Sequence, residues 1–180
     1  DELVALFEHT AEQAASRDDR IDLLLKAGRL WAEKLDDRDR AAQAYSRVLE
    51  IAPGHPAALR FLVGYHTEHE QWDKLVALYE DALRSRTTGE SEQAMLLQIG
   101  MVNWRMRADP DAAEPYFQRL RKVDPMHPGA LEFFREYYTE KGDQQKLSQI
   151  LSDAQRLAST PEHKVTLAIE VAKNAENGRN

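Results

Sequence analysis

The sequence predicts an all-α fold in which about ten antiparallel helices stack in pairs. Two observations carry this prediction. The 180-residue chain matches itself without a gap when it is shifted by 72 residues, so that Gly28 falls on Gly100 and Tyr45 falls on Phe117. Apolar residues also recur at steps of three and four, the period of an amphipathic helix, and no segment sustains the alternation of a β-strand. One such unit cannot bury its apolar side alone, so neighbouring units must stack.

Each predicted helix carries one stripe of apolar side chains. In the segment 39–51, for example, the stripe consists of Ala41, Ala42, Tyr45, Val48, Leu49 and Ile51. The same spacing, followed along the chain, predicts helices over residues 2–16, 20–35, 39–51, 56–69, 73–86, 91–107, 110–123, 128–141, 144–158 and 161–176.

The breaks between these segments contain residues that start and end helices. Asp109 is a capping residue, and it directly precedes a proline, which suits the first position of a helix. Pro56 and Pro128 suit the same position. Gly89 and Gly142 stand between helices, where a residue in the left-handed conformation ends a helix.

The segment 41–53 carries a motif of its own. The small residue Ala41 precedes the aromatic residue Tyr45, and Pro53 closes the segment. The 72-residue shift repeats this set as Ala113, Phe117 and Pro125. The motif resembles the tetratricopeptide repeat (TPR), a pair of helices A and B of about 34 residues. Gly28 and Gly100 lie near the small position of helix A in that pattern.

The resemblance implies a right-handed α-α superhelix, with helix A on the concave face and helix B on the convex one. It implies a single repeat domain over 1–180, made of a half repeat at 1–18, repeats at about 19–54, 55–89, 90–126 and 127–159, and a half repeat at 160–180. The second and fourth pairs depart from the pattern, because Leu75 and Leu147 stand at the small position and the closing proline is missing. Trp72, just before a helix B, is similar to the half-a-TPR variant.

The groove positions of helix A, carried over from the family, predict a partner-binding surface. These positions are Arg29, Glu33, Arg60, Glu68, Trp104, Arg105, Glu132, Glu136 and Glu140. The charges are mixed in the first half and acidic in the last helix of the set, which suits a ligand with a basic end. The Lys and Asn residues with which the family clamps a terminal carboxylate are missing, so recognition of chaperone tails of that kind is not expected.

Composition excludes several other functions. The net charge is −7, and no run of Lys or Arg exceeds two residues, so we expect no direct contact with nucleic acid. The chain has no cysteine, which removes disulfides and thiolate sites. No apolar stretch approaches the roughly 18 residues of a membrane span, and the chain starts without a basic, apolar leader. We therefore expect a cytoplasmic protein.

Residues that could form a catalytic or metal site have simpler roles. His66 and His69 share a helical face, but no third ligand recurs at a fixed spacing, so no metal is expected. His55 and His127 occupy matching turns, which indicates a structural role. Carboxylate pairs such as Asp36–Asp37 suit helix caps rather than acid–base chemistry. Since no catalytic motif is present, we expect no enzyme, no catalytic residue and no cofactor.

The two end helices are apolar on a side that lacks a partner. The first carries Leu3, Val4, Leu6 and Phe7, and the last carries Val165, Leu167, Ala168, Ile169 and Val171. Exposed apolar area of this kind drives association. The chain is therefore expected either to belong to a longer repeat array or to pair end to end with a second copy.

The resulting hypothesis is a protein–protein interaction scaffold within a larger protein, which binds a peptide or helix of a partner in the concave groove. Two alternatives stay open. One is a homo-oligomerising structural element, which the apolar ends favour. The other is a half-a-TPR type scaffold in RNA processing, which a basic stripe would have favoured.

Overall fold

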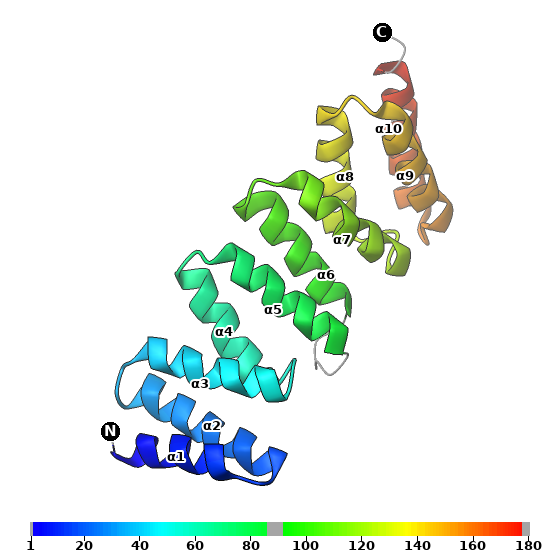
Figure 1. The fold of residues 1–180 in the computed structure, drawn as a ribbon. Coiled ribbons are helices and arrows are strands. Elements are labelled where there is room, and N and C mark those ends of the chain that lie inside the picture. Colours follow the sequence, from blue (N-terminus) through cyan, green and yellow to red (C-terminus); the bar gives the residue numbers. More distant parts are fainter. Residues whose placement is uncertain (1, 86–91, 178–180) are drawn as a thin grey trace. The chain divides into compact units, whose positions relative to one another are not determined.

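The protein is all α-helical over the residues that the computed structural model describes, 2–85 and 92–177, and these contain no strand (Figure 1). The predicted fold class is confirmed. The helices are α1 (Glu2–Gln13), α2 (Arg17–Glu33), α3 (Arg38–Ile51), α4 (Pro56–Glu68), α5 (Trp72–Ser85), α6 (Glu92–Met101), α7 (Pro110–Val123), α8 (Pro128–Glu140), α9 (Gln144–Leu157) and α10 (Pro161–Asn177), with a π-helical segment, η1 (Val102–Met106), directly after α6. None of these helices is both long and apolar enough to span a bilayer.

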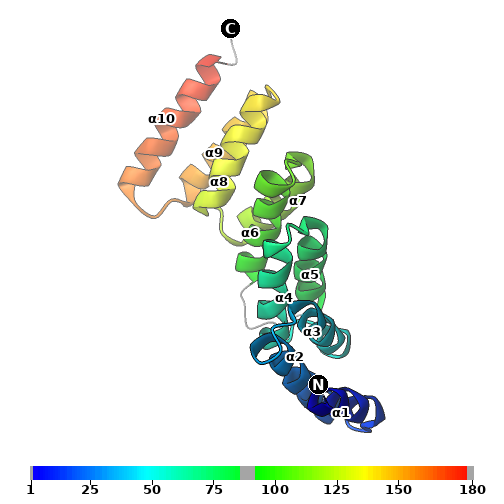
Figure 2. The same ribbon diagram turned by 90° about the vertical axis from the view of Figure 1, so that its left-hand side faces the viewer.

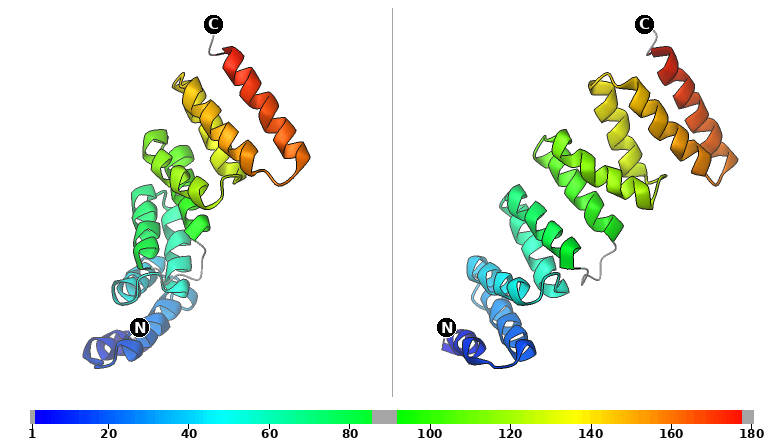
Figure 3. Two further views of the ribbon diagram at one scale, coloured as in Figure 1. Left: turned by 90° about the vertical axis from the view of Figure 1, so that its right-hand side faces the viewer. Right: turned by 45° about the vertical axis from the view of Figure 1, so that its right-hand side comes forward.

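The chain divides into two compact units, residues 1–91 (unit 1) and 92–180 (unit 2). Within each unit, consecutive helices run antiparallel and pack as hairpins, as Figure 2 and Figure 3 show. We call α2, α4, α6 with η1, α8 and α10 the A helices, and α1, α3, α5, α7 and α9 the B helices. Three predictions concern residues outside the described ranges: the role of Gly89, the repeat boundary beside it, and the helix ends at 86 and 91.

Side-chain caps set several of the helix starts. Asp37, Asp109 and Asp143 each accept a hydrogen bond from a backbone N–H three residues further on, at 3.0, 2.9 and 3.0 Å. Such a bond satisfies one of the free donors in the first turn. The start of α2 corrects the sequence prediction, because Ser16 caps this helix and it begins at Arg17 rather than at residue 20. The preceding helix, α1, also ends earlier than predicted, at Gln13 rather than at residue 16.

The turns between helices repeat with the 72-residue period. Asp36 and its counterpart Ala108 have positive φ angles of 52° and 50°, and Glu70 and its counterpart Gly142 have φ angles of 53° and 67°. A left-handed residue ends the preceding helix and satisfies carbonyls of its last turn. Backbone geometry is therefore shared between the units even where the side chain at the turn differs.

The crossing of helices A and B is tight because a glycine faces an aromatic ring. A Cβ atom added to Gly28 would lie 3.0 Å from ring carbons of Tyr45, and one added to Gly100 would lie 2.8 Å from Phe117. Ala41 and Ala113, at the small position of helix B, are completely buried. These residues occupy equivalent places in the two units, as the self-match predicts.

The buried core differs in composition between the units. In unit 1 it is mainly aliphatic, with Leu24, Ala27, Val48 and Leu62 around Trp31 and Tyr45. In unit 2 it is richer in aromatic side chains, which are Trp104, Phe117, Phe133, Phe134, Tyr137 and Tyr138. The rings of Phe117 and Phe133 stack at 4.3 Å between centroids.

The end helices are partly buried. Val4 of α1 and Leu167 of α10 lie in the core, whereas Leu3, Leu6, Val165 and Ile169 are at least half exposed. Each end helix therefore presents one apolar side to solvent.

Candidate functional site

Three of the predicted partner-binding residues come together in unit 2. Arg105, on η1, donates to both carboxylate oxygens of Glu136 at 3.0 and 3.2 Å and to Glu132 at 3.3 Å. Glu132 and Glu136 lie one turn apart on α8, so the guanidinium bridges two successive A helices. Further along the same helix, Arg135 donates to Glu170 of α10 at 3.0 and 3.3 Å. We call the surface formed by Arg105, Glu132, Glu136, Arg135 and Glu170 the A-helix face of unit 2.

Trp104 is buried beneath this face and packs against Arg105. It is only 7% exposed, and its ring packs edge-on against Phe117 and Phe133 at 5.9 and 5.2 Å. The guanidinium carbon of Arg105 lies 3.4 Å from the centroid of the indole, which is a cation–π contact. A partner on this face would therefore meet Arg105, and Trp104 would hold Arg105 in place.

The π-helical segment explains this placement. The backbone N–H of Arg107 bonds to the carbonyl of Val102, five residues back, at 3.0 Å. Asn103 turns inward, is 1% exposed and donates to the carbonyl of Ile99 at 3.1 Å. The widened turn buries Asn103 and Trp104 side by side, and it directs Arg105 outward. The apolar spacing of the sequence indicates neither this π-helical segment nor the burial of Asn103.

A cleft of about 390 Å³ adjoins the face, between α8 and α10. Leu131 and Leu167 are its buried apolar residues, and Glu132, Arg135 and His163 contribute polar groups. The last predicted residue of this helix, Glu140, is exposed at the end of α8. The following residue, Lys141, donates to Asp111, as does Tyr137 at 2.6 Å, and these bonds lower the pKa of Asp111 below its usual value.

The predicted residues of unit 1 are all exposed and do not form such a cluster. Glu68 pairs with Arg38 of α3 at 2.8 Å. Burial raises the pKa of Tyr45, and among the nearby charges Arg29 lowers it while Glu33 raises it. Arg60 lies on the exposed side of α4. In unit 2, by contrast, three predicted residues from two A helices, Arg105, Glu132 and Glu136, contact one another.

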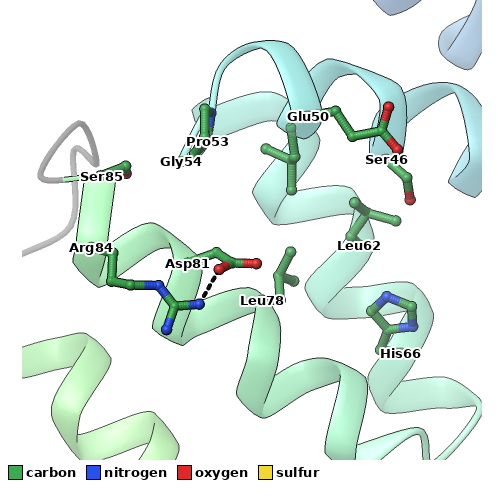
Figure 4. Close-up of a pocket in the computed structure, with 11 residues that line it drawn as sticks. Ser46, Glu50, Pro53, Gly54, Leu62, His66, Leu78, Asp81, Arg84 and Ser85 are labelled. Carbon is green, nitrogen blue, oxygen red and sulfur yellow. Dashed lines mark hydrogen bonds and ion pairs between the residues drawn. The ribbon is translucent and has the colours of Figure 1, made fainter.

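Unit 1 contains a larger cleft, of about 580 Å³, which the sequence analysis did not predict (Figure 4). It opens between the B helices α3 and α5 and reaches down to α4. Leu49, Leu62 and Leu78 supply apolar surface, and Glu50 and Asp81 supply carboxylates from its two sides. The 72-residue shift could have indicated this cleft, because in three aligned pairs the unit 1 residue is the smaller one. These pairs are Leu49 with Arg121, Leu62 with Phe134 and His66 with Tyr138.

His66 and His69, the two histidines that share a helical face, each have a local partner. Nδ1 of His66 lies 2.9 Å from Oε1 of Gln71, and Nδ1 of His69 lies 2.8 Å from the carbonyl of Tyr65. Burial lowers the pKa of His66 and outweighs the bond to Gln71. Within the described ranges, no group of three or more His, Cys, Asp or Glu side chains is placed to hold a metal ion.

The helices form successive pairs of an A helix and a B helix, and in two of these pairs a small residue faces an aromatic ring. This architecture is that of an α-helical repeat protein. The family model of the tetratricopeptide repeat matches residues 22–55. Among solved structures, YrrB, described as a TPR protein with an unusual peptide-binding site, is similar at 18% identity and a TM-score of 0.51, over 83% of this chain and 73% of that one. Residues 22–55 thus match a tetratricopeptide repeat, and the fold is similar to that of a TPR protein.

A second solved structure, a double mutant of MamA, covers 98% of this chain and 97% of its own at 12% identity, with a TM-score of 0.41. No curated protein matches the sequence.

Proposed function

We propose that this protein is a binding scaffold that holds a peptide or helix of a partner protein on the A-helix face of unit 2. The observation that carries the proposal is the bridge from Arg105 to Glu132 and Glu136, because it joins predicted groove residues of two successive A helices into one polar surface. TPR folds serve as protein–protein interaction scaffolds in general. The peptide-binding site named for YrrB is consistent with this use of the fold.

The partner is proposed to carry a basic segment. The face contains three carboxylates, Glu132, Glu136 and Glu170, against two guanidinium groups, and the cleft beside it has apolar side chains at its base. An apolar anchor in a cleft with charged residues around it is the usual anatomy of a specific interface. Arg105 competes with the partner for the two glutamates, so binding would displace or share its ion pairs.

The first test is a pull-down with the full chain from native lysate, followed by fluorescence-anisotropy titration of the captured segment. Glu132→Gln with Glu136→Gln should weaken binding about tenfold or more, because two charge-assisted contacts are lost. A matched control is Glu12→Gln with Glu92→Gln, since each of these carboxylates is also exposed and paired with one arginine. Equal effects of the two double variants would contradict the proposal.

Arg105→Gln separates two modes of binding. If the partner's basic group binds Glu132 and Glu136, removing the internal competitor should strengthen binding a few-fold. A loss of binding would mean that Arg105 itself contacts an acidic partner, which would refute the basic-segment proposal.

A second candidate function is self-association through the end helices. The observation that favours it is the exposure of Leu3 and Leu6 on α1 and of Val165 and Ile169 on α10, at 53%, 58%, 59% and 50%. Sedimentation of the isolated chain over a range of concentrations tests it. Val165→Ser with Ile169→Ser should abolish any association, and a strict monomer at all concentrations would eliminate this candidate.

A further inference from the structure

The cleft of unit 1 has a filled counterpart in unit 2. Both lie between successive B helices, α3 and α5 in unit 1 and α7 and α9 in unit 2, with an A helix beneath. The helix packing is similar in both units, since the side-chain bond from Tyr65 to Asp39 recurs as the bond from Tyr137 to Asp111, each at 2.6 Å. Unit 2 therefore shows which chemical groups fit a space of this shape.

Two aromatic side chains occupy the base of the space in unit 2. Phe134 and Tyr138 stand where unit 1 has Leu62 and His66. Their rings stack at 5.8 Å, and the hydroxyl of Tyr138 donates to Glu114 at 3.1 Å. Unit 1 has smaller side chains at both positions, so volume that is filled in unit 2 is left open beside α4 (Figure 4).

A cation bridges the two B helices in unit 2. Arg121 of α7 donates to Asp153 of α9 at 3.2 Å, and Asp153 also pairs with Arg156 of its own helix. In unit 1 the carboxylate and the neighbouring arginine are retained as Asp81 and Arg84, which pair in the same way. Leu49 of α3, however, stands where unit 2 has Arg121. The arginine that would bridge from α3 to Asp81 is therefore replaced by a leucine.

We propose that the cleft of unit 1 binds a peptide segment of a partner protein that presents an arginine beside a phenylalanine or tyrosine. The partner's guanidinium would bind Asp81 as Arg121 binds Asp153, and its ring would fill the space above Leu62 and His66. Arginine suits the site because it packs its apolar stem and pairs with a carboxylate at the same time.

The charges around the cleft select against anionic ligands. Glu50 from α3 and Asp81 from α5 place carboxylates on both sides, and Arg84 is held by Asp81. Burial keeps His66 largely neutral near pH 7 by lowering its pKa, so the ring adds no positive charge. Phosphate groups or an acidic peptide would meet like charge here.

The experiment is NMR titration of the ¹⁵N-labelled full chain with blocked ten-residue peptides of alanine and serine that carry one arginine and one phenylalanine, one to four positions apart. Saturable shifts are expected in the amides of residues 46–54 and 78–85. Peptides with glutamate in place of arginine, or serine in place of phenylalanine, should bind at least about tenfold more weakly.

Two variants test the site. Leu49→Arg with Leu62→Phe and His66→Tyr transplants the residues of unit 2, fills the cleft and should abolish binding. Asp81→Asn alters one exposed carboxylate without changing the packing and should weaken the arginine peptide about fivefold. Asp22→Asn, the same change on α2 outside the cleft, is its control and should have no effect.

The proposal is overturned if no peptide produces saturable shifts, if glutamate peptides bind equally well, or if binding survives the triple variant. It is also overturned if Asp81→Asn and Asp22→Asn behave alike. Self-association of the chain that the triple variant abolishes would make a second copy the occupant instead. This cleft lies in unit 1, so either result leaves the proposal for the A-helix face of unit 2 intact.

Discussion

The two units build the same helix crossing with different side chains. In unit 1, Gly28 faces Tyr45, whose ring contacts a half-buried Phe61 at 4.5 Å. In unit 2, Gly100 faces Phe117, which is fully buried and lies against both Phe133 and Trp104. The backbone contact is the same, while the aromatic packing around it is denser in unit 2. Turns and small residues thus determine how the helices cross, and side-chain volume determines whether gaps remain.

The largest difference between the units in the loss of unfolding free energy is expected at two phenylalanines in equivalent positions. Phe133→Ala should cost about 4 kcal/mol, because a fully buried ring is lost from a stacked cluster. Phe61→Ala, at the equivalent position, should cost about 2 kcal/mol, because this ring is already partly exposed. Urea unfolding of both variants, followed by circular dichroism, gives the two losses. Equal losses would show that the packing of the units does not differ.

A smaller difference is expected at the two glycines of the crossing. Gly100→Ala should destabilise by about 2 kcal/mol, because the added Cβ would lie within 2.9 Å of two carbons of a ring that cannot move. Gly28→Ala should cost less than about 1 kcal/mol, because the contact is looser and alanine favours a helix.

Gly64 of α4 provides the control for the glycines, since nothing lies within 4 Å of a Cβ added there. Gly64→Ala should stabilise by up to about 1 kcal/mol through helix propensity alone. Thermal unfolding of the three variants should therefore order the melting temperatures as Gly64→Ala above Gly28→Ala above Gly100→Ala.

The bridging cation of unit 2 should contribute about 1 kcal/mol or less. Arg121 and Asp153 are about a quarter exposed, at 23% and 26%, and their attraction is therefore partly screened. A double-mutant cycle with Arg121→Leu and Asp153→Asn measures the coupling. Leu49→Arg in unit 1 creates the matching pair with Asp81 and should be neutral or slightly stabilising. A destabilised Leu49→Arg variant would mean that the two spaces are not equivalent.

The smallest predicted effect is a loss of folding stability at acid pH, which comes from aspartates of unit 2. Burial by itself raises the pKa of Asp153, but hydrogen bonds from Arg156 and Arg121 outweigh it and lower that pKa below 3.8. A bond from the backbone of Lys146 likewise lowers the pKa of Asp143. A carboxylate with a lowered folded-state pKa stabilises the fold above its unfolded pKa, and this contribution is lost as pH falls through the folded value.

Unfolding free energies measured from pH 6 to pH 2.5 test this dependence. Stability should be constant down to about pH 4 and should fall below it. Asp153→Asn should make the fall shallower, and an unchanged slope in that variant would contradict the assignment.

Much of the fold could be predicted because it depends on local residues. The 72-residue match, the small residues facing aromatic rings and the helix caps at Asp37 and Asp109 are all visible in the sequence. The left-handed turn at Gly142 was predicted in the same way and is confirmed. Errors of three residues occurred at the end of α1 and the start of α2, where Ser16 gives no stronger signal than its neighbours.

The candidate sites were harder to predict, because they depend on contacts between helices. The placement of Arg105 follows from a π-helical turn, which no simple apolar spacing indicates. The cleft of unit 1 depends on three side chains from two helices being smaller than their counterparts. Each difference is visible when the two halves of the sequence are aligned. Only the three-dimensional structure shows that the three side chains line the same cleft.

The filled and open forms of this space have a consequence for how such a protein can acquire new specificity. When a segment is present twice, the two copies can share their backbone geometry while their internal side chains differ. Here the two units differ at Leu49, Leu62 and His66, yet they share the turns and the interhelical bond from Tyr65 to Asp39. A repeat can therefore contain a cleft where internal side chains are smaller, without any insertion, and the filled copy shows which side-chain groups fit that space.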